Sequence, residues 1–121
     1  MRQKIIQIKR VYEAPAADDG TRVLVDRLWP RGLRKDEVPL ALWLKDIAPT
    51  PALRTWFGHD PERWEAFRER YRAELDQHPD TVAQLRALAR EGRLTLLYAA
   101  RDEVHNHAVV LAEYLGRKSK S

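Results

Sequence analysis

Arginine and aspartate side chains follow two apolar segments of the sequence, and they are the first candidates for chemistry. One segment ends in Asp26 and Arg27, with Arg31 four residues later, and the other ends in Arg101. A guanidinium group binds a carboxylate or a phosphate through two parallel hydrogen bonds. The pattern therefore predicts a site for a small anion, in which Arg27, Arg31 and Arg101 hold the negative charge.

The two apolar segments, 22–26 and 94–100, have the pattern of strands that are buried on both faces of a sheet. If these strands are parallel, their carboxyl ends lie at one edge, where open α/β sheets bind ligands. Asp102 is expected to cap a helix that runs to about residue 115, and a helix N-terminus attracts anions. The sequence thus predicts a small three-layer α/β domain, whose at least partly parallel sheet of three or four strands is flanked by helices.

The remaining elements are predicted from apolar spacing and from start and stop residues. Residues 5–11 alternate loosely, as in a strand with one polar side, whereas residues 42–47 fit either a short strand or a helical turn. Three further helices are expected: one from Thr50-Pro51 to Gly58, one after Asp60, and one from a cap at Asp80 to Gly92. The second of these carries one apolar stripe, made by Trp64, Phe67, Tyr71 and Leu75.

Length and composition indicate one globular domain. The chain has 121 residues, 44% hydrophobic and 33% charged, and we assign residues 1–116 to the domain and 117–121 to a basic flexible tail. The absence of cysteine excludes disulfides and thiol chemistry. No signal peptide and no apolar run of membrane-spanning length are found, so we expect a cytoplasmic protein with no membrane partner.

The net charge of +4 is unevenly distributed. Residues 1–116 hold 19 basic residues against 18 acidic ones, so most of the excess lies in the tail. A surface that coats nucleic acid would need a larger excess than this. A nucleic-acid partner is therefore disfavoured, although the arginine-rich loop at residues 27–35 and the tail keep it possible.

Several other residues near the predicted strand ends could orient a ligand or transfer protons. Asp26 is a candidate general base. We favour the alternative, in which it is a structural carboxylate paired with another residue of the protein. His107 is either a hydrogen-bonded histidine of the interior or a group on the pocket rim. Trp29 could stack on a planar ligand or close over the sheet end. His59 and Asn106 are further candidates to orient a ligand.

No metal site is expected, because no histidine or carboxylate spacing of a known metal motif occurs. Glycine-rich phosphate loops and dinucleotide fingerprints are also absent, so the sequence leaves any cofactor unknown. Three functions stay open. The first is binding of an anionic small molecule or a nucleotide-like group. The second is a hydrolase or transferase that uses Asp26 or His107 without metal or thiol. The third is a nucleic-acid-binding module. A homo-oligomer that pairs through the strand at residues 5–8 is also possible.

Four segments resemble a known family: VDRLWPRG at 25–32, WLKDIAP at 43–49, LRTWFGHD at 53–60 and LLYAARD at 96–102. Together they are similar to the YeaO-like branch of the DUF488 family, and this resemblance implies a small α/β domain without an established activity. The wider family often carries Cys-x-Glu at the last strand and Cys-His-Arg in the last helix. The corresponding positions here are Tyr98, Ala100, Asn106, His107 and Ala108, of which only His107 keeps the residue type of the family.

Overall fold

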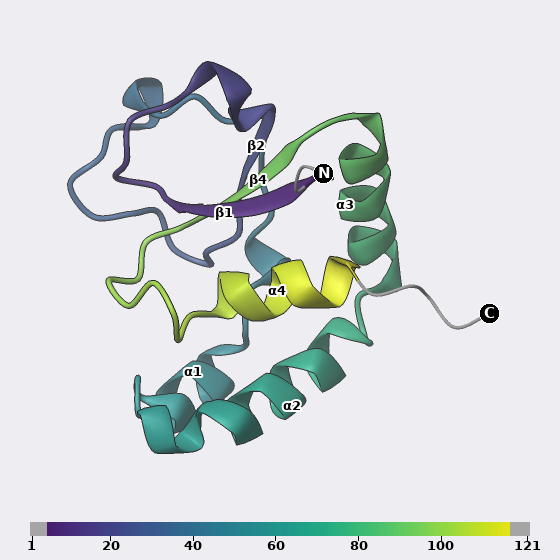
Figure 1. Cartoon of the computed structure of the whole chain (residues 1–121). Coiled ribbons are helices and arrows are strands. Elements are labelled where there is room, and N and C mark those ends of the chain that lie inside the picture. Colours follow the sequence, from purple (N-terminus) through teal and green to yellow (C-terminus); the bar gives the residue numbers. More distant parts are fainter. Residues whose placement is uncertain (1–4, 117–121) are drawn as a thin grey trace.

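Four parallel strands form a single sheet in a computed structural model that describes residues 5–116 (Figure 1). The strands are β1 (Ile6–Arg10), β2 (Thr21–Leu24), β3 (Leu42–Trp43) and β4 (Leu94–Tyr98). Their order is β1-β4-β2-β3, so the last strand of the chain lies between the first two. The α-helices are α1 (Pro51–Phe57), α2 (Trp64–Leu75), α3 (Pro79–Glu91) and α4 (His107–Gly116). The prediction of a small α/β domain with an at least partly parallel sheet is confirmed.

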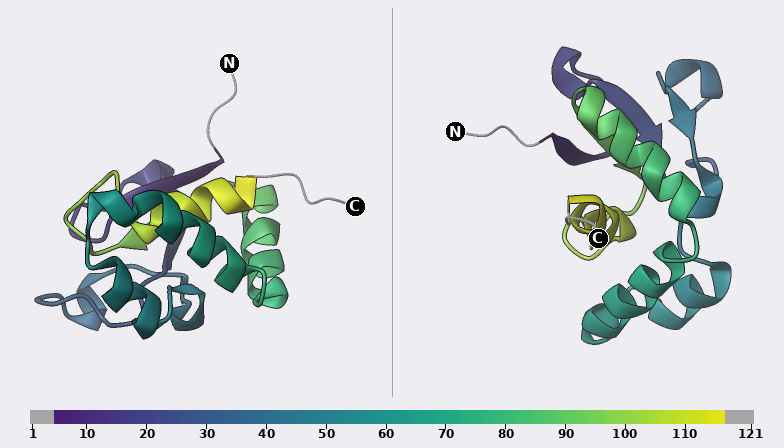
Figure 2. Two further views of the ribbon diagram at one scale, coloured as in Figure 1. Left: turned by 90° about the horizontal axis from the view of Figure 1, so that it is seen from below. Right: turned by 90° about the vertical axis from the view of Figure 1, so that its right-hand side faces the viewer.

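The two faces of the sheet are covered differently. Side chains of β2 and β4 alternate between a large cluster that contains the buried residues of all four α-helices and a smaller one that contains none of them. On the helical face, α4 packs on β1 and β4, and α2 packs on the other side of α4 (Figures 1 and 2). The opposite face is covered by residues from 12–20 and 26–41, whose helices are the short 3-10 turns Ala17–Asp19 and Lys35–Glu37.

Gly20 marks a close approach between two strand ends. Its φ of 66° lies in a region that residues with a Cβ rarely adopt, and an added Cβ would lie 2.2 Å from the carbonyl oxygen of Arg93. The next residue, Thr21, donates its backbone N–H to that same carbonyl at 2.9 Å. Gly20 therefore lets β2 begin directly beside β4.

Most of the helix signals are confirmed. The hydroxyl of Thr50 accepts a hydrogen bond from the N–H of Leu53, and Gly58 ends α1 in the left-handed conformation. Asp60 caps the 3-10 turn Pro61–Arg63, which leads into α2 with Phe67, Tyr71 and Leu75 buried. Residues 42–47 contain both expected alternatives, because β3 is followed by the 3-10 turn Lys45–Ile47.

Two predicted caps are wrong. Helix α3 begins at Pro79 with His78 at the N-cap, so Asp80 lies inside its first turn. Helix α4 begins at His107, not after Asp102, and the side chain of Asn106 accepts a hydrogen bond from the N–H of Val109 at 3.0 Å. Asp102 instead accepts from the N–H groups of Val104 and His105, and so folds a bend before the helix. Val104 lies in this bend and is 64% exposed.

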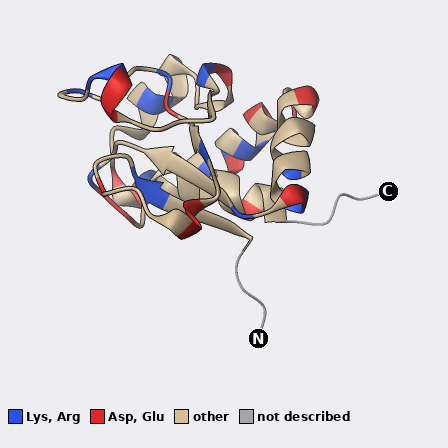
Figure 3. Ribbon diagram, turned by 90° about the horizontal axis from the view of Figure 1, so that it is seen from above, with Lys and Arg blue, Asp and Glu red and all other residues tan. Residues whose placement is uncertain are grey.

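Charged residues of both signs alternate along the ribbon in Figure 3 and form no continuous basic stripe in that view. The predicted tail, residues 117–121, lies outside the described residues. Strand β1 is an edge of the sheet, so pairing of two copies through residues 5–8 stays a prediction. Within residues 5–116, the structure contains no helix that is both long and apolar enough to cross a membrane.

Candidate functional site

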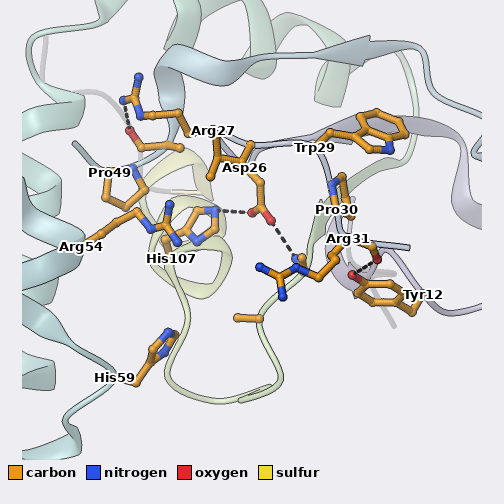
Figure 4. Close-up of a pocket in the computed structure, with 14 residues that line it drawn as sticks. Tyr12, Asp26, Arg27, Trp29, Pro30, Arg31, Pro49, Arg54, His59 and His107 are labelled. Carbon is orange, nitrogen blue, oxygen red and sulfur yellow. Dashed lines mark hydrogen bonds and ion pairs between the residues drawn. The ribbon is translucent and has the colours of Figure 1, made fainter. Parts of the chain in front are cut away.

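A cleft of about 280 Å³ opens at the carboxyl ends of β1, β2 and β4, the edge predicted for a ligand (Figure 4). Its walls come from the loops after β1 and β2, the segment before α1, the end of α1, and the residues that follow β4. The lining residues are Tyr12, Asp26, Arg27, Leu28, Trp29, Pro30, Arg31, Ala48, Pro49, Arg54, His59, Ala99, Ala100 and His107. Residues from distant parts of the sequence therefore meet here because parallel strands end together.

Within residues 5–116, Asp26 is the only carboxylate that lines the cleft. Its Oδ2 accepts the backbone N–H of Ala99 at 3.0 Å, which extends the hydrogen bonding between β2 and β4 beyond the strand ends. Its Oδ1 lies 3.1 Å from Nε2 of His107, and both side chains are 15% exposed. The backbone carbonyl of Asp26 accepts from the indole N–H of Trp43 at 2.7 Å. The hydrogen bond from Ala99 fixes the carboxylate, whereas Oδ1 is buried, accepts no hydrogen bond from residues 5–116 and contacts His107 by proximity alone.

The imidazole of His107 is held in one orientation. Its Nε2 lies between two acceptors, Asp26 Oδ1 and the carbonyl oxygen of Val25 at 3.0 Å. Two acceptors require that Nε2 carry a proton. No residue in 5–116 forms a hydrogen bond with Nδ1, which in the neutral imidazole carries a lone pair. His107 thus combines both expected roles, a hydrogen-bonded histidine and a group on the pocket wall.

Three arginines line the cleft, and only two of them are among those predicted. Arg27 and Arg54 lie on one side of the Asp26–His107 pair, and Arg31 lies on the other side beside Tyr12 (Figure 4). Arg101 is exposed and does not line the cleft, so the structure does not bring it together with Arg27 and Arg31. Arg54 was missed because it lies on α1, a helix whose position relative to the sheet could not be read from spacing.

Arg27 is anchored from the cleft wall. Its Nη2 donates to the carbonyl of Ala48 at 3.2 Å, and its Nη1 lies 3.7 Å from the exposed carboxylate of Asp46. The preceding carbonyl, that of Ile47, accepts the hydroxyl of the fully buried Tyr71 at 2.7 Å. Burial, assisted by the nearby Glu74 and Asp26 charges, raises the pKa of Tyr71 well above its usual value, so the phenol remains a donor. Tyr71 therefore fixes the segment to which Arg27 is attached.

Replacement of Tyr71 by phenylalanine should destabilise this wall. We expect Tyr71→Phe to lower the free energy of unfolding by about 1–2 kcal/mol, because the Ile47 carbonyl loses its buried partner. Urea unfolding followed by tryptophan fluorescence measures the change. Tyr12→Phe is the matched control: its hydroxyl donates to Arg31 on the exposed surface, and we expect a change within about 0.5 kcal/mol. Equal losses in the two variants would contradict the assignment.

Trp29 and Tyr12 are the aromatic residues of the main cleft. Trp29 points away from the Asp26–His107 pair (Figure 4); its indole N–H donates to the carbonyl of Leu33 and its ring packs at 5.3 Å against Trp43. This arrangement favours the role of Trp29 as a cover over the sheet end. Tyr12, which the sequence analysis did not select, lies beside Arg31 and holds its carbonyl at 2.8 Å.

The two remaining predicted residues, His59 and Asn106, differ in whether their side chains are accessible to a ligand. His59 is exposed, lines the cleft, and has a φ of 57° next to Gly58, a backbone conformation uncommon for a residue with a side chain. Asn106 is buried, and both ends of its amide are occupied: Oδ1 caps α4, and Nδ2 donates to the carbonyl of Asp102 at 2.9 Å. Within residues 5–116, no group of three histidine, aspartate or glutamate side chains could hold a metal ion.

The fold and the cleft define a small parallel α/β domain with cationic side chains at the carboxyl ends of its strands. The sequence matches the family described as the inactive DUF488-N3 subclade over residues 5–121, and the chain belongs to this family. It is 46% identical to the uncharacterised protein YeaO of Escherichia coli over 110 residues, which cover 91% of this chain and 96% of YeaO. An uncharacterised protein of Mycobacterium tuberculosis is 44% identical over 115 residues, 95% of this chain and 97% of that protein. No solved structure gives a significant match. The predicted resemblance to the YeaO-like branch of DUF488 is confirmed.

Proposed function

We propose that this domain binds a small anion, a phosphate or carboxylate group, in the cleft at the strand ends. One observation carries the proposal: two guanidinium groups from the loop after β2 and one from helix α1 line one cleft, in which residues 5–116 place a single carboxylate. That carboxylate is already paired with His107, so it competes little for the arginines. The guanidinium groups of Arg31 and Arg54 have no hydrogen bond or ion pair with any residue in 5–116.

A concave site favours a small ligand over a nucleic-acid strand. The arginines face a bounded cleft of about 280 Å³, a volume just below the usual range of about 300–1,000 Å³ for small-molecule pockets. A protein that tracks a nucleic-acid backbone needs a row of cations along an extended surface, and the basic residues outside the cleft are interspersed with acidic ones (Figure 3). We therefore place nucleic-acid binding second.

Two observations favour binding over catalysis. The family is described as an inactive subclade. In addition, no serine, threonine or cysteine of residues 5–116 lines the cleft, and the hydroxyl of Tyr12 there already donates to the carbonyl of Arg31. In this proposal, the pair orients the ligand by offering Nδ1 of His107 as an acceptor. We also propose that binding takes place in the cytoplasm, in line with a chain that contains no cysteine.

Removal of the Arg54 guanidinium tests the proposal. We expect Arg54→Ala to weaken binding of inorganic phosphate or acetate about tenfold, the effect of losing one charge-assisted hydrogen bond. Titrations followed by backbone amide chemical shifts give both the affinity and the location. Arg101→Ala is the matched control, because it removes the same exposed side chain outside the cleft and should leave both affinities unchanged. If neither anion shifts the cleft residues, the proposal is wrong.

A further inference from the structure

A side pocket adjoins the anion site, and we propose that the natural ligand carries a compact apolar or planar group that enters it. The ligand would then be a small organic phosphate or carboxylate, with its charged end at the arginines and its apolar end in the side pocket. This inference rests on the proposed anion site and adds the chemical class of the rest of the ligand.

The side pocket has a volume of about 50 Å³ and shares five lining residues with the main cleft, among them Arg54 and His107. The residues that line the side pocket alone are Phe57, Phe67, His105 and Asn106. Arg54 therefore stands where the two spaces meet. A ligand whose anion is held by Arg54 has its next atoms at the mouth of the side pocket.

The walls of the side pocket are aromatic and fixed. Phe57 and Phe67 are buried and stacked, with ring centroids 4.4 Å apart. His105 is held on one side by Asp102, whose Oδ2 lies 3.0 Å from Nδ1, and on the other by the edge-on ring of Trp64 at 5.2 Å. Rings that are already held in place need no ordering when a ligand enters, which favours binding.

The pocket offers few polar groups to a ligand. The amide of Asn106 is used in capping α4 and in bonding the carbonyl of Asp102. The imidazoles of His59, His105 and His107 are flat and present carbon atoms as well as nitrogens. A pocket of this kind stabilises an apolar or planar group, whereas a second charged group would lose its hydration there without gaining a partner.

The volume limits the size of that group. At roughly 10–15 Å³ per water-sized atom, 50 Å³ holds about four such atoms. Because the pocket opens into the main cleft, a six-membered ring can enter by one edge. A purine has a second fused ring that does not fit into the side pocket together with the first. The structure thus favours a single small ring or a short branched chain over the base of a purine nucleotide.

Four probes test the inference on the wild-type protein: inorganic phosphate, phenyl phosphate, acetate and benzoate. We expect each aromatic probe to bind about tenfold more tightly than the bare anion of its class, from the apolar area that the ring buries. Nuclear Overhauser effects from the probe ring to the protons of Phe57 and Phe67 should locate it. His105→Ala should abolish the advantage of the ring while phosphate affinity is retained, and His78→Ala, a histidine that lines neither space, should change nothing.

The outcomes separate the two proposals. If the bare anions and the aromatic probes bind equally, without contacts to Phe57 or Phe67, the side-pocket inference is overturned and the anion site stands. If none of the four binds in the cleft, the anion site itself is refuted. Adenosine 5′-monophosphate should bind no more tightly than phosphate, and a tighter complex with contacts to Phe57 would overturn the size limit. If His105→Ala fails to fold, the nuclear Overhauser effects from the probe ring to Phe57 and Phe67 in the wild-type protein still test the inference.

Discussion

Asp19→Asn should lower the free energy of unfolding by about 3–5 kcal/mol, the cost of removing one partner from a buried ion pair. Asp19 is 1% exposed and Arg22 is 7% exposed, and their side chains form a direct hydrogen-bonded ion pair on the sheet face opposite the helices. Lys9 adds a second cation at 3.1 Å. Asparagine keeps the size of the side chain but leaves two cations without a counter-charge.

The pH dependence of stability provides a second measure of the same carboxylate. Burial alone would raise the pKa of Asp19, but hydrogen bonds from the Ala16 N–H, Lys9 and Arg22 outweigh burial and hold the pKa below its usual value of 3.8. A lowered pKa means that the carboxylate contributes its full stabilisation above pH 3.8 and loses it as the pH falls through the lower pKa of the folded protein. The difference between wild type and Asp19→Asn should therefore shrink below that pH.

Chemical denaturation at neutral and at acidic pH measures both effects. Asp18→Asn is the matched control, because Asp18 is the exposed neighbour on the same 3-10 turn and its side chain forms no hydrogen bond or ion pair with any residue in 5–116. We expect the control to change stability by less than about 0.5 kcal/mol. A loss under 1 kcal/mol in Asp19→Asn would mean that the ion pair contributes little beyond packing.

Asp26→Ala should lower the free energy of unfolding by about 2–3 kcal/mol, because the backbone N–H of Ala99 loses its acceptor and an unmet buried donor costs about 1–3 kcal/mol. The backbone N–H of Ala99 loses its partner altogether, while Nε2 of His107 keeps only the carbonyl of Val25. Asp26→Asn retains an amide oxygen for Ala99, so we expect a loss of only about 1–2 kcal/mol. Thermal unfolding of the three proteins tests this order.

Although Asp26→Asn should lower the stability of the protein, it should raise the affinity for an anion. Asp26→Asn removes the only negative charge that lines the cleft. A unit charge about 8 Å from a bound anion, at an effective dielectric constant near 40, contributes about 1 kcal/mol, which corresponds to about fivefold in affinity. We therefore expect Asp26→Asn to be less stable but to bind phosphate about fivefold more tightly. Weaker binding in Asp26→Asn would show instead that the carboxylate orients His107 for the ligand more than it repels the anion.

Local sequence patterns predicted a strand or a helix correctly where the residues concerned favour only one kind of structure. The fully buried strand at 94–98 and the Thr50 to Gly58 helix follow from an uninterrupted apolar run and from paired start and stop residues. The capping predictions at Asp80 and Asp102 were wrong because aspartate folds bends as readily as it caps helices. The choice between them depends on what the following residues can bury, and Val104 has no core to face.

The composition of the candidate site was predictable only in part. Asp26, Arg27 and Arg31 were selected because they follow a strand directly, and the carboxyl ends of parallel strands meet at one edge. Arg54 and the side pocket could not be found in this way, because α1 and α2 are placed by long-range packing against α4 and against each other. Arg101 follows a strand just as Arg27 does, but the bend at Asp102 leaves it on the surface.

The sequence by itself determined that this protein is an α/β domain of the DUF488 family, with an at least partly parallel sheet and arginine after its second strand, because burial patterns and family motifs are local properties of the chain. Only the tertiary structure decided the strand order, the pairing of Asp26 with His107 across 80 residues, and the meeting of Arg54 with Arg27 and Arg31 around one cleft. The physical reason is that these arrangements depend on which elements bury surface against each other, and one sequence carries no direct record of that choice.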